Sequence, residues 1–243
     1  MWEWLLTPID LSREHHVGAA LSWHARTMTL AWGVLAPTAI FVARYMKILP
    51  WQDWPRELDS TFWWAVHWKS QTLAYALSLL GLGLIWSASG ELPSAPLHKA
   101  FGYTLLVLGT LQVASGYFRG SKGGPTDPRS DGSLHGDHYD MTCWRIAFEW
   151  VHRVAGYAAL FLGGTTILSG LWAANAPRWM WGAILGYWLI LVLAAVFAQS
   201  KGRAFDTYQA IWGADPTLPG NKISKMGWWT TRPGDHPDTK PGE

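Results

Sequence analysis

Five long stretches without a charged residue dominate this sequence. They cover residues 27–43, 70–90, 100–118, 154–177 and 179–200. A helix that spans a bilayer needs about 20 mostly apolar residues, within a range of roughly 17 to 25. A surface helix of a soluble protein instead keeps one polar face. The sequence therefore predicts an all-α polytopic membrane protein with five transmembrane helices.

The composition agrees with this prediction and excludes several classes of soluble protein. Charged residues make up 15% of the chain, compared with about 25% in a typical soluble domain. The mean hydropathy is only +0.04 because polar connections separate the apolar windows. Most of the 19 tryptophans stand near the window ends, as expected of aromatic belts at the two surfaces of a bilayer. A net charge of +2 argues against a nucleic-acid-binding protein.

Lysine and arginine residues fall mostly on one side of the predicted membrane. Five spans place thirteen of them on the side of the first loop, the third loop and the C-terminal tail, and four on the other side. The positive-inside rule makes the richer side cytoplasmic. We therefore expect the N-terminus outside and the C-terminus inside. The first residues lack the basic start of a cleavable signal peptide, so the first span is expected to act as its own insertion signal.

Three regions follow from this organisation. Residues 1–21 form a short N-terminal segment, and residues 22–200 form the transmembrane domain. That domain includes a cytoplasmic loop, residues 120–140, which is rich in Gly, Pro, Asp and Ser and predicts irregular turns. Residues 201–243 form a polar cytoplasmic tail, which we expect to be extended and partly disordered. Trp212, Trp228 and Trp229 could dock the tail on the membrane surface.

One histidine stands near the start of each of the first four predicted spans: His24, His67, His98 and His152. Consecutive spans start on opposite sides, so His24 and His98 share one depth, and His67 and His152 share the other. Ionisable residues at membrane depth are candidate functional residues. Pairs of imidazoles on neighbouring helices are suitable axial ligands for a six-coordinate haem iron. The alternatives are interfacial histidines that only make hydrogen bonds, or zinc, although neither pair alone completes a three- or four-ligand zinc site.

Other residues could support such a cofactor. Gly102 and Gly156 follow His98 and His152 by four residues, on the same helix face, and would leave room for a porphyrin edge. Four cations next to the histidines could bind haem propionates or could snorkel to lipid headgroups, with neither role favoured: Arg26, Lys99, Lys69 and Arg153. His135 and His138 in the loop could bind a metal, but a loop turn is favoured. Cys143, the only cysteine, excludes a CxxCH attachment and a cysteine-ligated iron–sulfur cluster.

Four motifs in order resemble the cytochrome b561 family. The first span reads HARTMTLAWGVLAPTAIFVARY from residue 24 and resembles the opening helix of that family, with its WGxLxP stretch and ARY end. The next three are HWKSQ at 67–71, HKAFG at 98–102 with LGTLQ following, and HRVAG at 152–156 with a later SGL. The similarity covers about residues 22–200. The chain departs from well-known animal and plant members, which have six helices, use ascorbate and carry a serine-tryptophan signature where residues 97–100 read LHKA.

The resemblance implies two non-covalent b haems and electron transfer across the membrane. It pairs His24 with His98 and His67 with His152, the same pairs that share a depth. The donor and acceptor are expected to be a small reductant, a quinone or a redox protein, which would make the chain an oxidoreductase component. The alternative is a haem-bearing anchor or accessory subunit of a larger complex, and a homodimer is also compatible. The compact form and the lack of a sorting signal favour a bacterial inner membrane.

Overall fold

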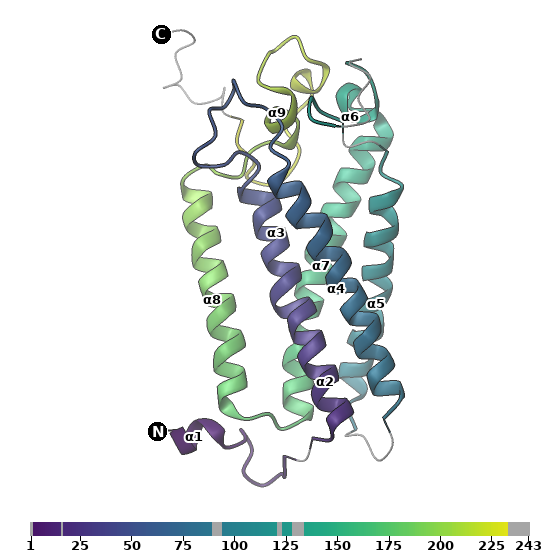
Figure 1. The fold of residues 1–243 in the computed structure, drawn as a ribbon, viewed down its shortest axis with the longest axis vertical. Coiled ribbons are helices and arrows are strands. Elements are labelled where there is room, and N and C mark those ends of the chain that lie inside the picture. Colours follow the sequence, from purple (N-terminus) through teal and green to yellow (C-terminus); the bar gives the residue numbers. More distant parts are fainter. Residues whose placement is uncertain (1, 16, 89–93, 121–122, 128–133, 233–243) are drawn as a thin grey trace. The chain divides into compact units, whose positions relative to one another are not determined.

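The computed structural model is helical and describes residues 2–15, 17–88, 94–120, 123–127 and 134–232. Apart from two isolated bridges, Pro8 with Pro177 and Phe205 with Thr231, the described residues form no β-structure. The elements, drawn in Figure 1, are α1 (Trp2–Leu6), α2 (Ala19–Met28), η1 (Thr29–Leu35), α3 (Ala36–Tyr45), α4 (Phe62–Trp86), α5 (Pro96–Tyr117), α6 (Asp137–Asp140), α7 (Cys143–Ala173), α8 (Arg178–Ser200), α9 (Thr207–Trp212) and η2 (Pro219–Lys222).

Each charge-free window is helical over most of its length. Three helical stretches are long and apolar enough to cross a membrane: Ala19–Tyr45, Cys143–Ala173 and Arg178–Ser200. The helices α4 and α5, with 25 and 22 residues, carry histidine, lysine and glutamine within their length and are not among the three. α7 begins at Cys143, so His152 lies further from the start of its helix than the sequence predicted. The ion pair of Arg145 with Glu149, one turn apart, favours this N-terminal extension.

The chain divides into two compact units. Unit 1 contains residues 1–38, 69–113 and 155–193, and unit 2 contains residues 39–68, 114–154 and 194–243. The long helices α4, α5, α7 and α8 contribute a segment to each unit. His24 and His98 therefore belong to unit 1, and His67 and His152 belong to unit 2.

In unit 1 the first long helix contains a π-helical turn, η1, between α2 and α3. Pro37 has no backbone N–H, so the carbonyl of Gly33, four residues earlier, loses its usual helical donor. The indole Nε1 of Trp188 on α8 donates to this carbonyl at 2.9 Å. The indole of Trp32 on η1 donates to Ser78 Oγ on α4 at 2.8 Å. A Cβ on Gly33 would lie 2.9 Å from Ile184 Cδ1, so a larger residue there would require the end of the Ile184 side chain to move.

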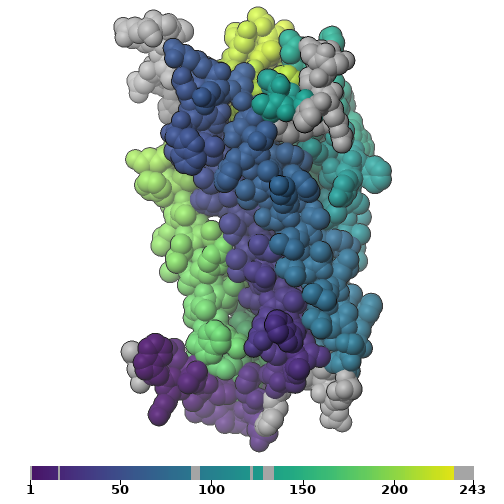
Figure 2. Space-filling model, in the orientation of Figure 1, coloured from purple at the N-terminus to yellow at the C-terminus, as the bar shows by residue number. Residues whose placement is uncertain are grey.

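The helix α8 exposes an apolar surface in unit 1. Leu189, Ile190 and Leu193 are 59%, 66% and 60% exposed, and α8 is the green surface in Figure 2. A soluble monomer rarely exposes contiguous apolar surface on this scale. The exposed face of α8 is therefore suited to a lipid environment.

The tail folds in unit 2, which contradicts the extended conformation expected for residues 201–232. Asp206 caps α9 by accepting from the Tyr208 backbone N–H at 2.8 Å, and it also pairs with Arg232 Nε at 3.0 Å. Tyr208, Ala210 and Ile211 of α9 are buried. The polar composition of the tail did not indicate that these residues would pack in the interior. The indole of Trp212 donates to His138 Nδ1 at 3.1 Å, and docking of the tail tryptophans on a membrane surface stays a prediction. The rest of the tail, 233–243, lies outside the described residues, as do 121–122 and 128–133 of the loop.

Candidate histidine-pair site

The four histidines form the two expected pairs. In unit 1, the ring centroids of His24 on α2 and His98 on α5 are 6.1 Å apart, with an interplanar angle of 79°. In unit 2, the centroids of His67 on α4 and His152 on α7 are 6.3 Å apart, with an angle of 76°. Each unit therefore contains two facing imidazoles from different helices.

Backbone carbonyls orient the unit 1 pair. His24 Nδ1 lies 2.8 Å from the Gly81 carbonyl oxygen on α4, and His98 Nδ1 lies 3.0 Å from the Thr166 carbonyl oxygen on α7. A carbonyl oxygen can only accept a hydrogen bond, so each Nδ1 carries the proton and donates it. In the neutral imidazole, Nε2 then has the free lone pair that a metal requires.

The unit 2 pair has longer polar contacts and more aromatic neighbours. His67 Nδ1 lies 3.4 Å from the Ala39 carbonyl oxygen, and His152 Nδ1 lies 3.3 Å from Ser115 Oγ. Phe148 stacks on His152 with centroids 5.1 Å apart. Trp64 lies 6.3 Å from the His67 ring. The second pair therefore has an aromatic neighbour on each histidine.

The pair geometry fits two axial ligands of one metal ion. A metal–imidazole bond is about 2.0 Å long, and a ring nitrogen lies about 1.1 Å from the ring centre, so ligands on opposite sides of one ion have centroids about 6 Å apart. Both pairs meet this spacing. Ring contact alone could also give it, since aromatic pairs lie 4.5–7 Å apart. The protonation of Nδ1 in unit 1 is the further feature that favours metal ligation there.

A zinc site has less support from the arrangement. Zinc sites in proteins use three or four protein ligands. Within the described part of the chain, no group of three or more His, Cys, Asp or Glu residues could hold a metal ion together. A porphyrin supplies four equatorial nitrogens itself, so two histidines are enough for haem.

The two predicted glycines have room beside them. A Cβ on Gly102 would lie 3.9 Å from Thr166 Cγ2, and a Cβ on Gly156 would lie 3.7 Å from Gln112 Nε2. These are ordinary contacts, so neither glycine is required by the protein packing itself. Their role beside a porphyrin edge stays a prediction. The sequence did not indicate Gly81 or Thr166 as partners of the histidines, because backbone carbonyls carry no residue-type signal.

The predicted cations differ in their surroundings. Arg26 and Lys99 in unit 1 and Lys69 on α4 are exposed. The Arg26 guanidinium lies over the Trp23 ring, 5.1 Å from its centroid. Arg153 in unit 2 is half-buried, and its Nη2 lies 3.8 Å from Glu149 Oε2. A contact with propionates stays a prediction for all four.

A buried ionic cluster in unit 2 was not predicted from the sequence. The Glu149 side chain is 9% exposed and lies 2.9 Å from Arg145 Nε and 3.7 Å from His138 Nε2. His138 is buried, and its Nδ1 accepts from Trp212 Nε1 at 3.1 Å. This hydrogen bond occupies Nδ1 and connects His138 to α9 within unit 2. The His135 ring makes an edge contact with Tyr139.

Lys47 and Arg119 are further cations of unit 2. Lys47 Nζ donates to the Phe205 carbonyl oxygen at 2.8 Å. Burial, together with repulsion from Arg153, lowers the pKa of Lys47 to about 8. Arg119 lies over the Trp64 ring at 3.8 Å, and burial lowers its pKa to about 10. Both positions are outside the helices, where no pattern in the sequence indicates burial.

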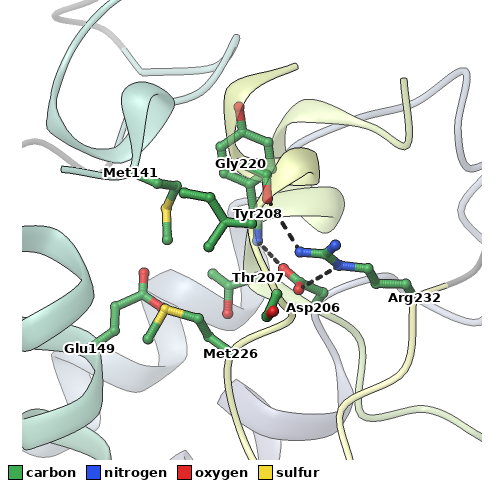
Figure 3. A pocket seen from close by; sticks show the side chains of 10 residues that line it. Met141, Glu149, Asp206, Thr207, Tyr208, Gly220, Met226 and Arg232 are labelled. Atoms are coloured by element: carbon green, nitrogen blue, oxygen red, sulfur yellow. Dashed lines mark hydrogen bonds and ion pairs between the residues drawn. The ribbon is translucent and has the colours of Figure 1, made fainter. Parts of the chain in front are cut away.

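A small polar cavity lies in unit 2 between α7 and the tail. Figure 3 shows Glu149, Met141 and Met226 on one side and the Asp206–Arg232 pair on the other. Its volume is about 10 Å³, comparable to the space that one water molecule needs. The cavity is too small for an organic substrate.

Comparisons with known proteins support the family resemblance. The chain is 31% identical over 177 residues to a cytochrome b561 and DOMON domain-containing protein of Arabidopsis thaliana, covering 72% of this chain and 32% of that protein. It is 25% identical over 197 residues to a cytochrome b561, DM13 and DOMON domain-containing protein of the same plant, covering 79% and 19%. A third such plant protein, named for cytochrome b561 and DOMON domains, is 24% identical over 185 residues, covering 75% and 39%.

The chain thus spans about a fifth to two fifths of the length of these curated relatives. No family model and no solved structure matches the chain. The relatives are plant proteins and give no support to a bacterial location.

Proposed function

We propose that this chain is a cytochrome b561-type membrane protein that transfers electrons across the bilayer through two non-covalent b haems. His24 and His98 would ligate one haem, and His67 and His152 the other. The observation that carries the proposal is the pairing of the four imidazoles at 6.1 and 6.3 Å. The named relatives are cytochrome b561 proteins, which supports haem as the cofactor and a membrane as the location.

The chain's own residues would bind and orient the cofactor. The carbonyl groups of Gly81 and Thr166 fix the tautomer of His24 and His98, and such partners raise the basicity of a ligating imidazole. The aromatic neighbours of His67 and His152 would pack around the second haem ligand pair. When bound, haem would supply one-electron redox chemistry at its iron.

The proposal includes five spans, with the N-terminus outside and the C-terminus in the cytoplasm. Support comes from the five long helices and from the asymmetric distribution of Lys and Arg. The bilayer is then the first partner of the chain, and the exposed apolar face of α8 is suited to it. A bacterial inner membrane stays a prediction from the sequence alone.

The electron donor and acceptor are proposed only by class, as a small reductant, a quinone or a redox protein. An accessory subunit of a larger complex would bind the same two haems but would copurify with other subunits. An electron-transfer protein acting alone or as a homodimer would instead be reduced by a small donor after purification.

Haem content tests the proposal directly. We expect the purified protein to show a b-type reduced-minus-oxidised spectrum and a pyridine haemochrome yield of two haems per chain. His98→Ala should lose one haem, His152→Ala the other, and the double variant both. His135→Ala, which changes an exposed histidine outside both pairs, should retain two. A protein without haem, or a double variant that retains both haems, would refute the assignment.

A further inference from the structure

One turn of α7 holds the ring of His98, a residue of α5. Thr166, Ser169 and Gly170 are spaced so that they share one face of α7. The Thr166 carbonyl oxygen lies 3.0 Å from His98 Nδ1, and Ser169 Oγ lies 3.4 Å from the same nitrogen. Ser169 Oγ also donates to the Thr166 carbonyl at 2.9 Å. Two polar groups of this turn therefore fix the Nδ1 edge of the imidazole.

Gly170 allows the ring to lie this close to the helix backbone. A Cβ at position 170 would lie 2.9 Å from His98 Cε1 and 3.1 Å from Nδ1. Such contacts are too short for any ordinary side chain. The ring could move away only by breaking its bond to Thr166 or by changing its position relative to His24. α7 has four glycines, and a Cβ would come within 3.0 Å of another residue only at Gly170.

We propose that Gly170 is a positioning residue for the haem of unit 1. By admitting the His98 ring against α7, it sets the rotamer in which Nδ1 donates to the Thr166 carbonyl and the ring faces His24 at 6.1 Å. Gly170 would thus act on the cofactor only through His98. The inference rests on the proposed haem ligation.

The test compares two alanine substitutions in the same helix. Gly170→Ala should displace His98, so that haem content falls from two to one per chain or half of the haem leaves the low-spin state in the electron paramagnetic resonance spectrum of the oxidised protein. Gly164→Ala is the matched control, because a Cβ there would lie 3.7 Å from Trp188. It should retain two low-spin haems. A Gly170→Ala protein with two low-spin haems and an unchanged spectrum would overturn the inference.

A double variant separates positioning from general packing. In a His98→Ala protein the ring that would clash is absent, so adding Gly170→Ala should change neither the haem content nor the thermal midpoint further. This outcome also decides the case in which Gly170→Ala alone fails to accumulate. A double variant that is lost while His98→Ala accumulates would show a structural role instead. A wild-type protein without haem would refute the proposed function itself, independently of Gly170.

Discussion

Single residues in unit 1 compensate for the backbone irregularity of the first long helix. Pro37 removes a donor from the helix, and Trp188 replaces it at the Gly33 carbonyl. The Trp and Pro of the WGVLAP motif are both visible in the sequence. The role of Trp188 as donor to Gly33 cannot be read from the sequence. The two residues are 155 positions apart, and only helix packing brings them together.

Trp188→Phe should destabilise the protein, since it leaves a buried carbonyl without its donor. A loss of about 1–3 kcal/mol in the free energy of unfolding is expected, measured as a lower thermal midpoint in detergent. Trp181→Phe on the same helix is the control. Its buried indole nitrogen makes no hydrogen bond within the described residues, so its loss should cost little. Equal midpoints for the two variants would contradict the role of Trp188.

The histidines were predictable as residues, but their hydrogen-bond partners were not. One histidine near the start of each of the first four predicted spans, on alternating sides, is enough to predict both pairs. The oxygen partners of His24 and His98 lie 57 and 68 positions away along the chain. A backbone carbonyl is present in every residue, so only the helix register selects Gly81 and Thr166.

At the scale of elements, hydropathy predicted where helices occur but not how the polar segments fold. The tail was expected to be extended because it is polar and contains several prolines. The buried residues of α9, Tyr208, Gln209, Ala210 and Ile211, form a short mixed run that is too brief to stand out in composition. The Asp206–Arg232 pair closes this segment across 26 positions, which no local pattern indicates.

Lys47 joins the segment after α3 to the tail and should make this connection sensitive to pH. The folded protein releases the Lys47 proton at a pKa of about 8, whereas the unfolded chain keeps it up to about 10.4. At a pH between these two pKa values, unfolding takes up a proton at Lys47. The free energy of unfolding should therefore rise with pH across this range. Thermal midpoints between about pH 8 and 9.5 should increase in the wild type and stay flatter in Lys47→Met.

Lys201→Met is the control for that measurement, because Lys201 is exposed and should leave the slope unchanged. A wild-type midpoint that falls across the same range would contradict burial of the Lys47 ammonium group.

At the scale of the whole molecule, the proposed topology places the N-terminus on the outer side of the membrane and the C-terminus on the cytoplasmic side. Cys143 is exposed and is the only cysteine of the chain. The five-span proposal places it on the cytoplasmic side, at the start of the fourth span. It therefore serves as a natural reporter of orientation.

A membrane-impermeant maleimide should label Cys143 in inverted vesicles and leave it unlabelled in sealed right-side-out vesicles. Cys143→Ser should abolish the signal. Leu11→Cys in that background, at an exposed N-terminal position, should show the opposite pattern. Labelling of both positions from the same side would exclude an odd number of spans between them and would refute the topology.

The amino-acid pattern was enough to predict long apolar helices and to predict which of the four histidines lie together. Both follow from periodic or segmental properties, since charge-free length and alternation of direction are local features of a chain. The fold shows which polar group lies beside each imidazole, which glycine lets a ring approach α7, and that the tail residues up to 232 fold. These depend on contacts between residues far apart in sequence, where helix register and packing select one partner among many chemically equivalent groups.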